Sequence, residues 1–310
     1  MIDVAAAKDI ILKNTENFGS EEVPFLKSVG RVLKENIYAD RPFPPFNRVA
    51  MDGVAIVYHE FNNGTREFPI AGIQAAGSEQ ETMHNAAHCY EVMTGASLPK
   101  NTDTVVRYED VEIKNGMAKI RVSTINKGQN IHKKGTDQEE GSILIQQNTI
   151  ISPAEIGIIA TVGKSTVKVA KTPKVIVIST GNELVEVSEK PLDHQIRRSN
   201  VYTLVSLLEK INIPAETAHL TDDKKTLKEK IRQYLVDFDA LLFSGAVSKG
   251  KYDFLPEVLE ELGVRKEFHR VSQRPGKPFW FGSTLTTTKK RNRLKILLFL
   301  LFLEIQFQPM

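Results

Sequence analysis

Three short loops carry residue types that could bind a phosphorylated ligand. They span 179–184 (STGNEL), 221–223 (TDD) and 244–253 (SGAVSKGKYD), and each follows a predicted strand. Glycines and small side chains let backbone N–H groups face an anion. A single loop of this kind is a plain turn about as often as it is a binding site. Three loops at one edge of a sheet are stronger evidence.

These loops also supply hydroxyl and carboxylate groups. The residues expected to contact phosphate are Ser179, Thr180, Gly181, Ser244, Gly245 and Ser248. The carboxylates in the same loops are Glu183, Asp222 and Asp253. Carboxylates suit a hard cation such as Mg²⁺. The sequence does not show which of them, if any, acts as a base.

Arg274 and Lys277 stand on either side of a Pro-Gly turn in the segment RPGKPFWFG. Two cations on a rigid turn suit phosphate or another oxyanion such as molybdate. A solvated turn explains this motif alone equally well.

A second polar group precedes these loops. Asp52 stands in a Met-Asp-Gly turn, Thr94 ends a predicted strand, and Asp137 lies in KKGTDQ. Together they could serve Mg²⁺, although an isolated Asp-Gly is more often a hairpin turn. We expect no histidine-based zinc site.

Alternating strands and helices position the three loops. Strands are predicted at 174–180, 214–220 and 238–244, and helices at about 199–211 and 222–237. The first strand is a continuous β-branched apolar run, which is typical of a central parallel strand. This alternation predicts a doubly wound α/β domain, whose ligands bind beyond the carboxyl ends of the strands.

The 310 residues leave room for two or three domains, so we expect a multi-domain α/β and β protein. Residues 1–46 are predicted to form an N-terminal helix and connector, 47–140 an inserted all-β domain, and 141–170 the return of the connector. Residues 171–282 form the incomplete α/β domain, and 283–310 an aberrant tail. Ser152, followed by proline and by Glu155, predicts a helix start.

Composition limits the class of protein. The chain is 41% hydrophobic and 25% charged, with a net charge of +3, which excludes disorder and gives no electrostatic case for nucleic acid or an anionic membrane. The single cysteine, Cys89, excludes a disulfide framework and a thiolate zinc cluster. We expect a cytoplasmic protein.

Seven motifs occur in a specific order over about residues 1–282. They are PPFNRVAMDGVAI, MTGASLPKNTDTVV, GTD, SPAEIGIIATVG, VIVISTGNEL, SGAVSKGKYD and RPGKPFWFG. This order resembles the molybdopterin molybdenumtransferases, the family that completes molybdenum cofactor synthesis and includes the catalytic part of gephyrin-like proteins.

The resemblance implies an elongated subunit that forms a homodimer and inserts molybdenum from molybdate into adenylylated molybdopterin, releasing AMP with the help of Mg²⁺ or a similar cation. The α/β domain would be the molybdopterin-binding domain, and the β domain of the partner subunit would help to close the cleft. A pterin adenylyltransferase would be the pathway partner. The implied catalytic residues are Asp52, Thr94, Glu183, Asp222 and Asp253. The implied metal ligands are Asp137, Glu183 and Asp253, and Asn200 joins the loop residues that hold the pterin substrate. Arg274 and Lys277 would hold molybdate or phosphate.

The chain departs from the family pattern at several places. Arg198 replaces a common acidic residue, Ala246 a usual glycine, and Arg274 a frequent lysine. After Gly282 the family continues through a Leu-Pro-Gly-Asn-Pro-Val-Ser loop into a helix and a further domain. Back-translating the last residues one base out of register permits Gly-Asn-Pro-Val-Ser-Thr. We therefore hypothesise a frameshift between about 286 and 298, and expect the tail to have no selected structure and to leave an apolar face of the α/β domain uncovered.

Two other interpretations remain open at this point. A non-catalytic dimeric scaffold, or a decayed pseudoenzyme, could keep the same fold; Arg198, Ala246 and the altered C-terminus favour it. The related pterin adenylyltransferase shares the α/β domain but lacks the preceding β region, so the first 170 residues count against that assignment.

Overall fold

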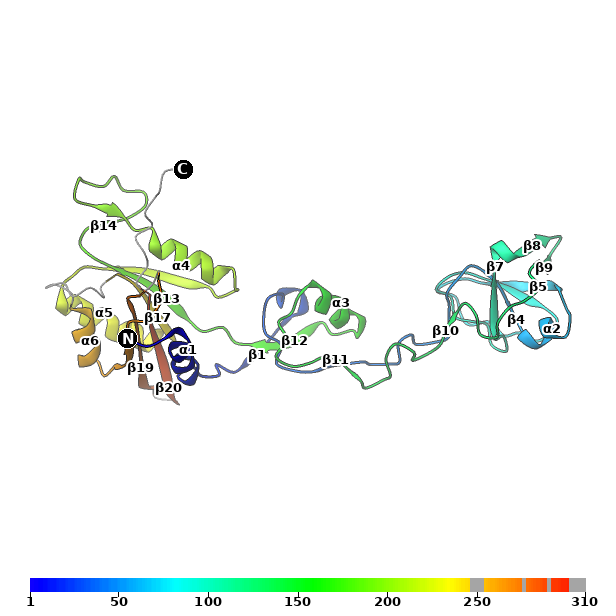
Figure 1. Ribbon diagram of the computed structural model, residues 1–310, viewed down its shortest axis with the longest axis horizontal. Coiled ribbons are helices and arrows are strands. Elements are labelled where there is room, and N and C mark those ends of the chain that lie inside the picture. Colours follow the sequence, from blue (N-terminus) through cyan, green and yellow to red (C-terminus); the bar gives the residue numbers. More distant parts are fainter. Residues whose placement is uncertain (246–253, 275–276, 289–290, 301–310) are drawn as a thin grey trace. The chain divides into compact units, whose positions relative to one another are not determined.

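The computed structural model divides the chain into two units, drawn in Figure 1. Unit 1 contains residues 1–34 and 167–310, and unit 2 contains residues 35–166. The structure describes residues 1–245, 254–274, 277–288 and 291–300. None of the helices in these described ranges is long and apolar enough to cross a membrane.

The predicted apolar strand lies inside the sheet of unit 1. β13 (Val175–Thr180) is buried along its whole length and pairs in parallel with β16 (Ala215–Leu220) on one side and β17 (Ala240–Ser244) on the other. The full order of the six strands is β16-β13-β17-β20-β19-β18. The remaining strands are β18 (Arg265–His269), β19 (Phe279–Thr288) and β20 (Arg291–Leu300).

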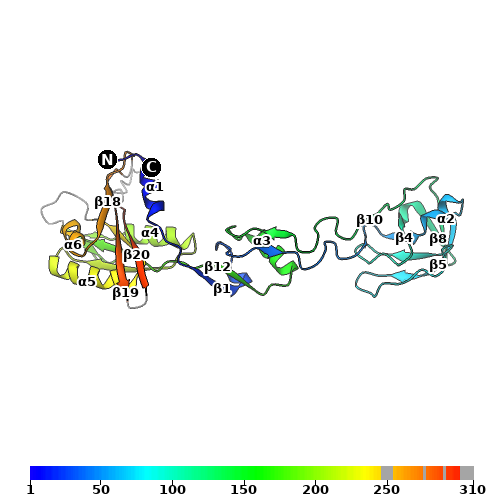
Figure 2. The same ribbon diagram turned by 90° about the horizontal axis from the view of Figure 1, so that it is seen from below.

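Helices cover both faces of this sheet, as the sequence predicts (Figures 1 and 2). One face carries Ile176 and Ile178 and packs against α5 (Lys224–Asp237) and α6 (Leu255–Glu261). The opposite face of β13 packs against α4 (Asn200–Glu209), and α1 (Val4–Lys13) covers the far strands. Burial of each such aliphatic side chain contributes about 1.5–3 kcal/mol.

Two two-stranded pairs also belong to unit 1. β1 (Ser20–Pro24) pairs with β12 (Thr166–Ala170). The segment that connects β13 to α4 contains the parallel pair β14 (Leu184–Val185) and β15 (Ile196–Arg197).

The end of the chain differs from expectation. The sequence predicts a tail without selected structure after Gly282, whereas β19 continues to Thr288 and β20 occupies the position between β17 and β19. β20 runs parallel to β17, with Ala240 opposite Ile296, and antiparallel to β19. A continuous apolar run is also the pattern of a strand that is covered on both faces, and the two neighbouring strands supply its backbone partners.

Unit 2 contains the predicted all-β region. Its six-stranded sheet has the order β7-β4-β6-β5-β9-β8 and a core that includes Val54, Phe68 and Val106. These strands are β4 (Gly53–Ile56), β5 (Glu67–Gln74), β6 (Cys89–Val92), β7 (Thr104–Arg107), β8 (Val111–Lys114) and β9 (Met117–Ile120). A short helix, α2 (Tyr58–Asn62), follows β4.

Two-stranded pairs and one helix form the rest of unit 2. β3 (Arg48–Val49) pairs with β10 (Ile131–His132), and β2 (Ile37–Tyr38) with β11 (Ile143–Ile145). α3 (Pro153–Thr161) begins with the predicted capping box, in which the Ser152 backbone N–H donates to Glu155 and the Ala154 N–H donates to the Ser152 hydroxyl.

Candidate functional site

The three predicted loops leave the same edge of the unit 1 sheet. Thr180 at the end of β13 lies opposite Leu220 of β16, and Ser179 lies opposite Ser244 of β17. The loops that follow these strands therefore begin side by side, which confirms the common edge that the sequence predicts. In open parallel sheets, ligands bind in the crevice beyond this carboxyl edge.

Thr180 presents a buried hydroxyl group at this edge. The residue is 4% exposed, and its Oγ1 has no hydrogen-bond partner within the described part of the chain. Gly245 faces Thr180 with φ +105°, and a Cβ at Gly245 would lie 3.3 Å from Thr180 Oγ1. A buried hydroxyl without a partner costs about 1–3 kcal/mol, so such groups call for an explanation, of which a ligand contact is one.

Glycine is also required in the first loop. Gly181 has φ +131°, which L side chains rarely adopt, and a Cβ there would lie 2.6 Å from Glu183 Oε1. The Glu183 carboxylate therefore lies close over the Gly181 backbone while the side chain stays exposed. This arrangement brings one carboxylate to the edge where phosphate is expected.

The second loop is tied to the first. The Asp222 backbone N–H donates to Asn182 Oδ1 at 3.2 Å. The neighbouring Asp223 instead caps α5, because its Oδ2 accepts from the Thr226 N–H at 2.7 Å, and that hydrogen bond lowers the pKa of Asp223. Asp222 therefore remains the candidate site carboxylate of this loop, and Asp223 is explained by the helix.

The turn with Arg274 and Lys277 lies at the same edge. β19 runs antiparallel to β20, and Phe279 at its start pairs with Leu300, which pairs with Ser244. The segment that precedes Phe279 therefore emerges where β17 ends. Arg274 and Lys277 are both exposed. The edge thus combines backbone N–H groups, hydroxyls and two cations, a set suited to a ligand with several anionic groups.

Two further side chains of unit 1, those of His219 and Arg198, have partners that the sequence does not reveal. His219 stands one residue before the end of β16, and its Nδ1 lies 3.0 Å from Ser179 Oγ. Arg198, which is 9% exposed, forms a salt bridge with Glu186. The hydrogen bond that Arg198 donates is the largest cause of the lowered pKa of Glu186. The only available signal for His219 is its position near the end of a predicted strand.

Asn200 is the first residue of α4 and lies two positions after Arg198. It is half-buried and lies at the end of the segment that connects β13 to α4. Ser248 and Asp253, and Ala246 among the departures from the family pattern, lie outside the described residues.

In unit 2, Asp52 and Thr94 lie together. Asp52 Oδ1 accepts from the Thr94 backbone N–H at 2.6 Å and from the Thr94 hydroxyl at 2.7 Å. The backbone hydrogen bond is the largest cause of a lowered Asp52 pKa, and the hydroxyl adds to it. Asp52 is thus an oriented, charged carboxylate rather than only a hairpin residue.

Asp137 in unit 2 is also oriented by a neighbour. Its Oδ1 lies 2.8 Å from His132 Nε2, and His132 Nδ1 lies 3.1 Å from an Arg48 nitrogen. The sequence predicts a site role for Asp137 but gives no signal for His132 or Arg48.

The described residues contain no group of three or more His, Cys, Asp or Glu side chains that could hold a metal. His84 and His88 do have the four-residue spacing of a helical metal pair, but they stand in a loop rather than on one helix face. Mg²⁺ usually takes one or two protein carboxylates plus substrate phosphates, so Glu183 beside the phosphate loops is compatible with it.

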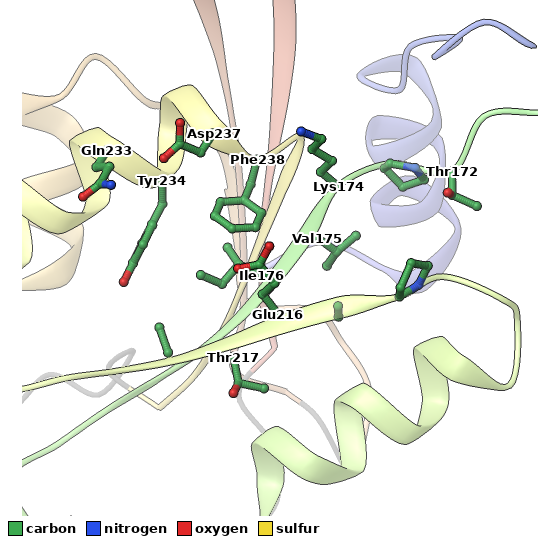
Figure 3. A pocket seen from close by; sticks show the side chains of 14 residues that line it. Thr172, Lys174, Val175, Ile176, Glu216, Thr217, Gln233, Tyr234, Asp237 and Phe238 are labelled. Atoms are coloured by element: carbon green, nitrogen blue, oxygen red, sulfur yellow. The ribbon is translucent and has the colours of Figure 1, made fainter. Parts of the chain in front are cut away.

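A hollow of about 670 Å³ lies at the opposite end of the same strands (Figure 3). The first residues of β13 and β16 line it, and Tyr234 and Phe238 reach into it from the end of α5. Burial, and secondly Glu216, raises the pKa of Tyr234. None of the expected site residues lines this hollow, which is therefore separate from the carboxyl edge.

Comparisons with known proteins cover both units. Residues 2–163 match the family model of the MoeA N-terminal region (domains I and II), and residues 176–300 match a probable molybdopterin-binding domain. A molybdopterin molybdenumtransferase from Synechocystis sp. is 42% identical over 284 residues, which are 91% of this chain and 73% of that protein. Gephyrin from Dictyostelium discoideum is 32% identical over 92% of this chain and 43% of its own length. The crystal structure of a molybdopterin biosynthesis MoeA protein from Pyrococcus horikoshii superposes with a TM-score of 0.79 at 29% identity, covering 96% of this chain and 74% of that one.

Proposed function

The chain belongs to the MoeA family of molybdopterin molybdenumtransferases, enzymes of molybdenum cofactor biosynthesis, and we propose from this that it inserts molybdenum from molybdate into adenylylated molybdopterin and releases AMP. The substrate is a phosphoanhydride, so the protein must hold several oxyanions and position the reacting groups. The carboxyl edge of unit 1 offers the groups for that task.

The observation that carries the proposal is the arrangement around Thr180. Its buried hydroxyl lacks a partner among the described residues, and Gly245 keeps the adjacent space free of a side chain. A phosphate oxygen placed there would accept the hydroxyl hydrogen and could also accept from the loop N–H groups. The same contact would remove the cost of the unpaired hydroxyl.

The charged residues have separate parts in the proposed site. Arg274 and Lys277 would bind molybdate or a phosphate, because fixed cations offset the charge of oxyanions. Asp222 would act beside the first loop, to which its backbone is bonded. Mg²⁺, when bound, would neutralise phosphate charge, and Glu183 is the described carboxylate of unit 1 that we propose would hold it.

We propose further that the active form is a homodimer, in which Asp52, Thr94 and Asp137 of unit 2 act on the site of the partner subunit. All three residues are exposed, and the carboxylates of Asp52 and Asp137 are oriented by hydrogen bonds, as expected of groups that meet a substrate from outside. A pterin adenylyltransferase would supply the adenylylated substrate. Because the single cysteine is buried and unpaired, we also propose that the protein works in the cytoplasm.

The direct test is a single-turnover assay. Purified protein is mixed with adenylylated molybdopterin, molybdate and Mg²⁺, and the released AMP and the incorporated molybdenum are both quantified. We expect molybdate-dependent AMP release in a one-to-one ratio with incorporated molybdenum. Tight substrate binding without AMP release would refute the proposal and favour the non-catalytic scaffold.

A further inference from the structure

His132 connects an arginine to a candidate site carboxylate. It ends β10, and the antiparallel pairing with β3 places it directly opposite Arg48. Side chains of directly opposite residues project on the same face of a two-stranded pair, about 5 Å apart. This register explains why Arg48 and His132 meet although 84 residues separate them.

The chemistry of the two contacts fixes where the imidazole proton lies. A guanidinium group has only N–H donors and no acceptor. Because an Arg48 nitrogen lies 3.1 Å from Nδ1 of His132, Nδ1 must offer its lone pair. The proton of a neutral ring is then on Nε2, which lies 2.8 Å from Asp137 Oδ1 and donates to it.

The Asp137 carboxylate remains available on its other side. Within the described residues, Oδ2 accepts no hydrogen bond, and the side chain is 52% exposed, compared with 31% for His132. The backbone nearby is also fixed, since the Asp137 N–H donates to the Phe43 carbonyl oxygen at 2.9 Å. One carboxylate oxygen is thus held by His132, while the other has no hydrogen-bond partner among the described residues and belongs to a side chain that is half exposed.

We propose that His132 is a positioning residue for Asp137. Arg48 and Asp137 together select the Nε2–H tautomer of His132, and that N–H holds Asp137 Oδ1 so that Oδ2 meets the substrate in one orientation. The inference rests on the proposed function, because only that function gives Asp137 a part in the reaction. The tautomer itself can be measured without any turnover.

The first experiment is a long-range ¹H–¹⁵N correlation spectrum of the histidine rings in the full chain. It is recorded about two pH units above the ordinary histidine pKa of about 6.5, where imidazole is neutral. The His132 signals, assigned by their loss in H132Q, should show the Nε2–H tautomer. In the double variant R48M/D137A, which removes both partners of the ring, a fraction of the Nδ1–H form should appear, whereas R48M alone should keep the Nε2–H form because Asp137 still accepts from Nε2. An Nδ1–H tautomer in the unaltered protein would overturn the proposal.

The second experiment separates positioning from folding. In H132Q the amide oxygen can accept from Arg48 while the amide nitrogen donates to Asp137, whereas H132A loses both contacts. We expect H132A to lower kcat for AMP release about tenfold and H132Q to restore it to within about threefold. H84A, which changes an exposed loop histidine of the same unit, is the matched control and should keep full activity.

The variant D137N distinguishes this inference from the proposed function. If D137N keeps a reduced but measurable kcat and the double variant H132A/D137N has the same kcat, the two residues act as one unit. If D137N keeps full activity, the assigned role of Asp137 fails even where the tautomer is as expected. If D137N is inactive while H132A is fully active, or if H132Q is as impaired as H132A, the positioning role is wrong.

Discussion

Replacing Thr180 by valine should strengthen the ligand-free fold and weaken substrate binding. The hydroxyl is buried without a partner among the described residues, which costs about 1–3 kcal/mol relative to a hydrated hydroxyl in the unfolded chain. Valine keeps the branched shape and exchanges this hydroxyl for a buried methyl group. Because the fit of the new methyl group is imperfect, we expect the lower end of that range, a gain of about 1 kcal/mol in the free energy of unfolding of unit 1.

Binding should change in the opposite direction. A hydrogen bond to a charged group contributes about 1.5–3 kcal/mol, so loss of the Thr180 contact should raise the Kd for adenylylated molybdopterin at least about tenfold. Titration calorimetry measures this Kd. Urea unfolding measures the stability, and it can be followed by fluorescence because Trp280, the single tryptophan, is buried in the core of unit 1.

Ser179→Ala is the matched control, one residue earlier on the same strand. Its hydroxyl already lies 3.0 Å from His219 Nδ1, so its removal should destabilise unit 1 by about 1 kcal/mol. The reasoning about Thr180 is refuted if T180V destabilises unit 1 as much as S179A does, since the hydroxyl would then have a partner in the fold. Unchanged affinity in T180V would refute its contact with the substrate.

Ser152→Ala should lower the stability of unit 2 by about 1 kcal/mol through loss of the α3 cap, as measured by denaturant unfolding followed by circular dichroism. The hydrogen bond from Ser152 lowers the pKa of Glu155. The stabilisation from Glu155 should therefore be fully present above pH 4.5, the ordinary pKa, and be lost as the pH falls through the lowered pKa. If wild type and E155Q differ in stability by the same amount at acid pH as at neutral pH, this prediction is wrong. Phe243→Ala should cost about 3–5 kcal/mol, because Phe243 is completely buried in unit 1, and an expressed variant that keeps its urea midpoint would be inconsistent with that packing. If unit 2 acts on the partner subunit, mixing inactive D52N and E183Q dimers in equal amounts should restore roughly a quarter of the active sites, because about half of the dimers become mixed and each mixed dimer has one site with both native residues. No recovery of AMP release after subunit exchange would exclude that arrangement.

Local patterns account for what the sequence predicted well. The apolar run of β13 and its parallel neighbours follow from continuous β-branched sequence, and α3 begins directly after its N-cap Ser152 because Ser152 and Glu155 have the spacing of a capping box. The common edge of the three loops follows from parallel pairing alone, since all such strands end on one side. These features require no knowledge of distant contacts.

Contacts between distant segments account for what the sequence missed. Nothing near His132 indicates that Arg48 lies beside it, because the pairing of β3 with β10 brings them together. Arg198 shows a different limit: the sequence revealed a cation where the resembling family has an acid, but not that Glu186 supplies a paired carboxylate there. The sequence did not reveal the strands after Gly282, because an apolar run has the same composition whether it is a free peptide or a strand with partners on both sides.

The strand order also constrains how a ligand can lie on the candidate site. Thr180 ends β13, and the turn with Lys277 precedes β19, three strand positions away in the order β13-β17-β20-β19. Adjacent strands are about 4.8 Å apart, so these two groups are separated by roughly 14 Å along the edge. A single oxyanion is too small to contact both. If one ligand uses the hydroxyl loop and the cationic turn together, it must be an extended molecule with anionic groups distributed along it, and a pterin joined to a nucleotide through a pyrophosphate meets that requirement where molybdate alone does not.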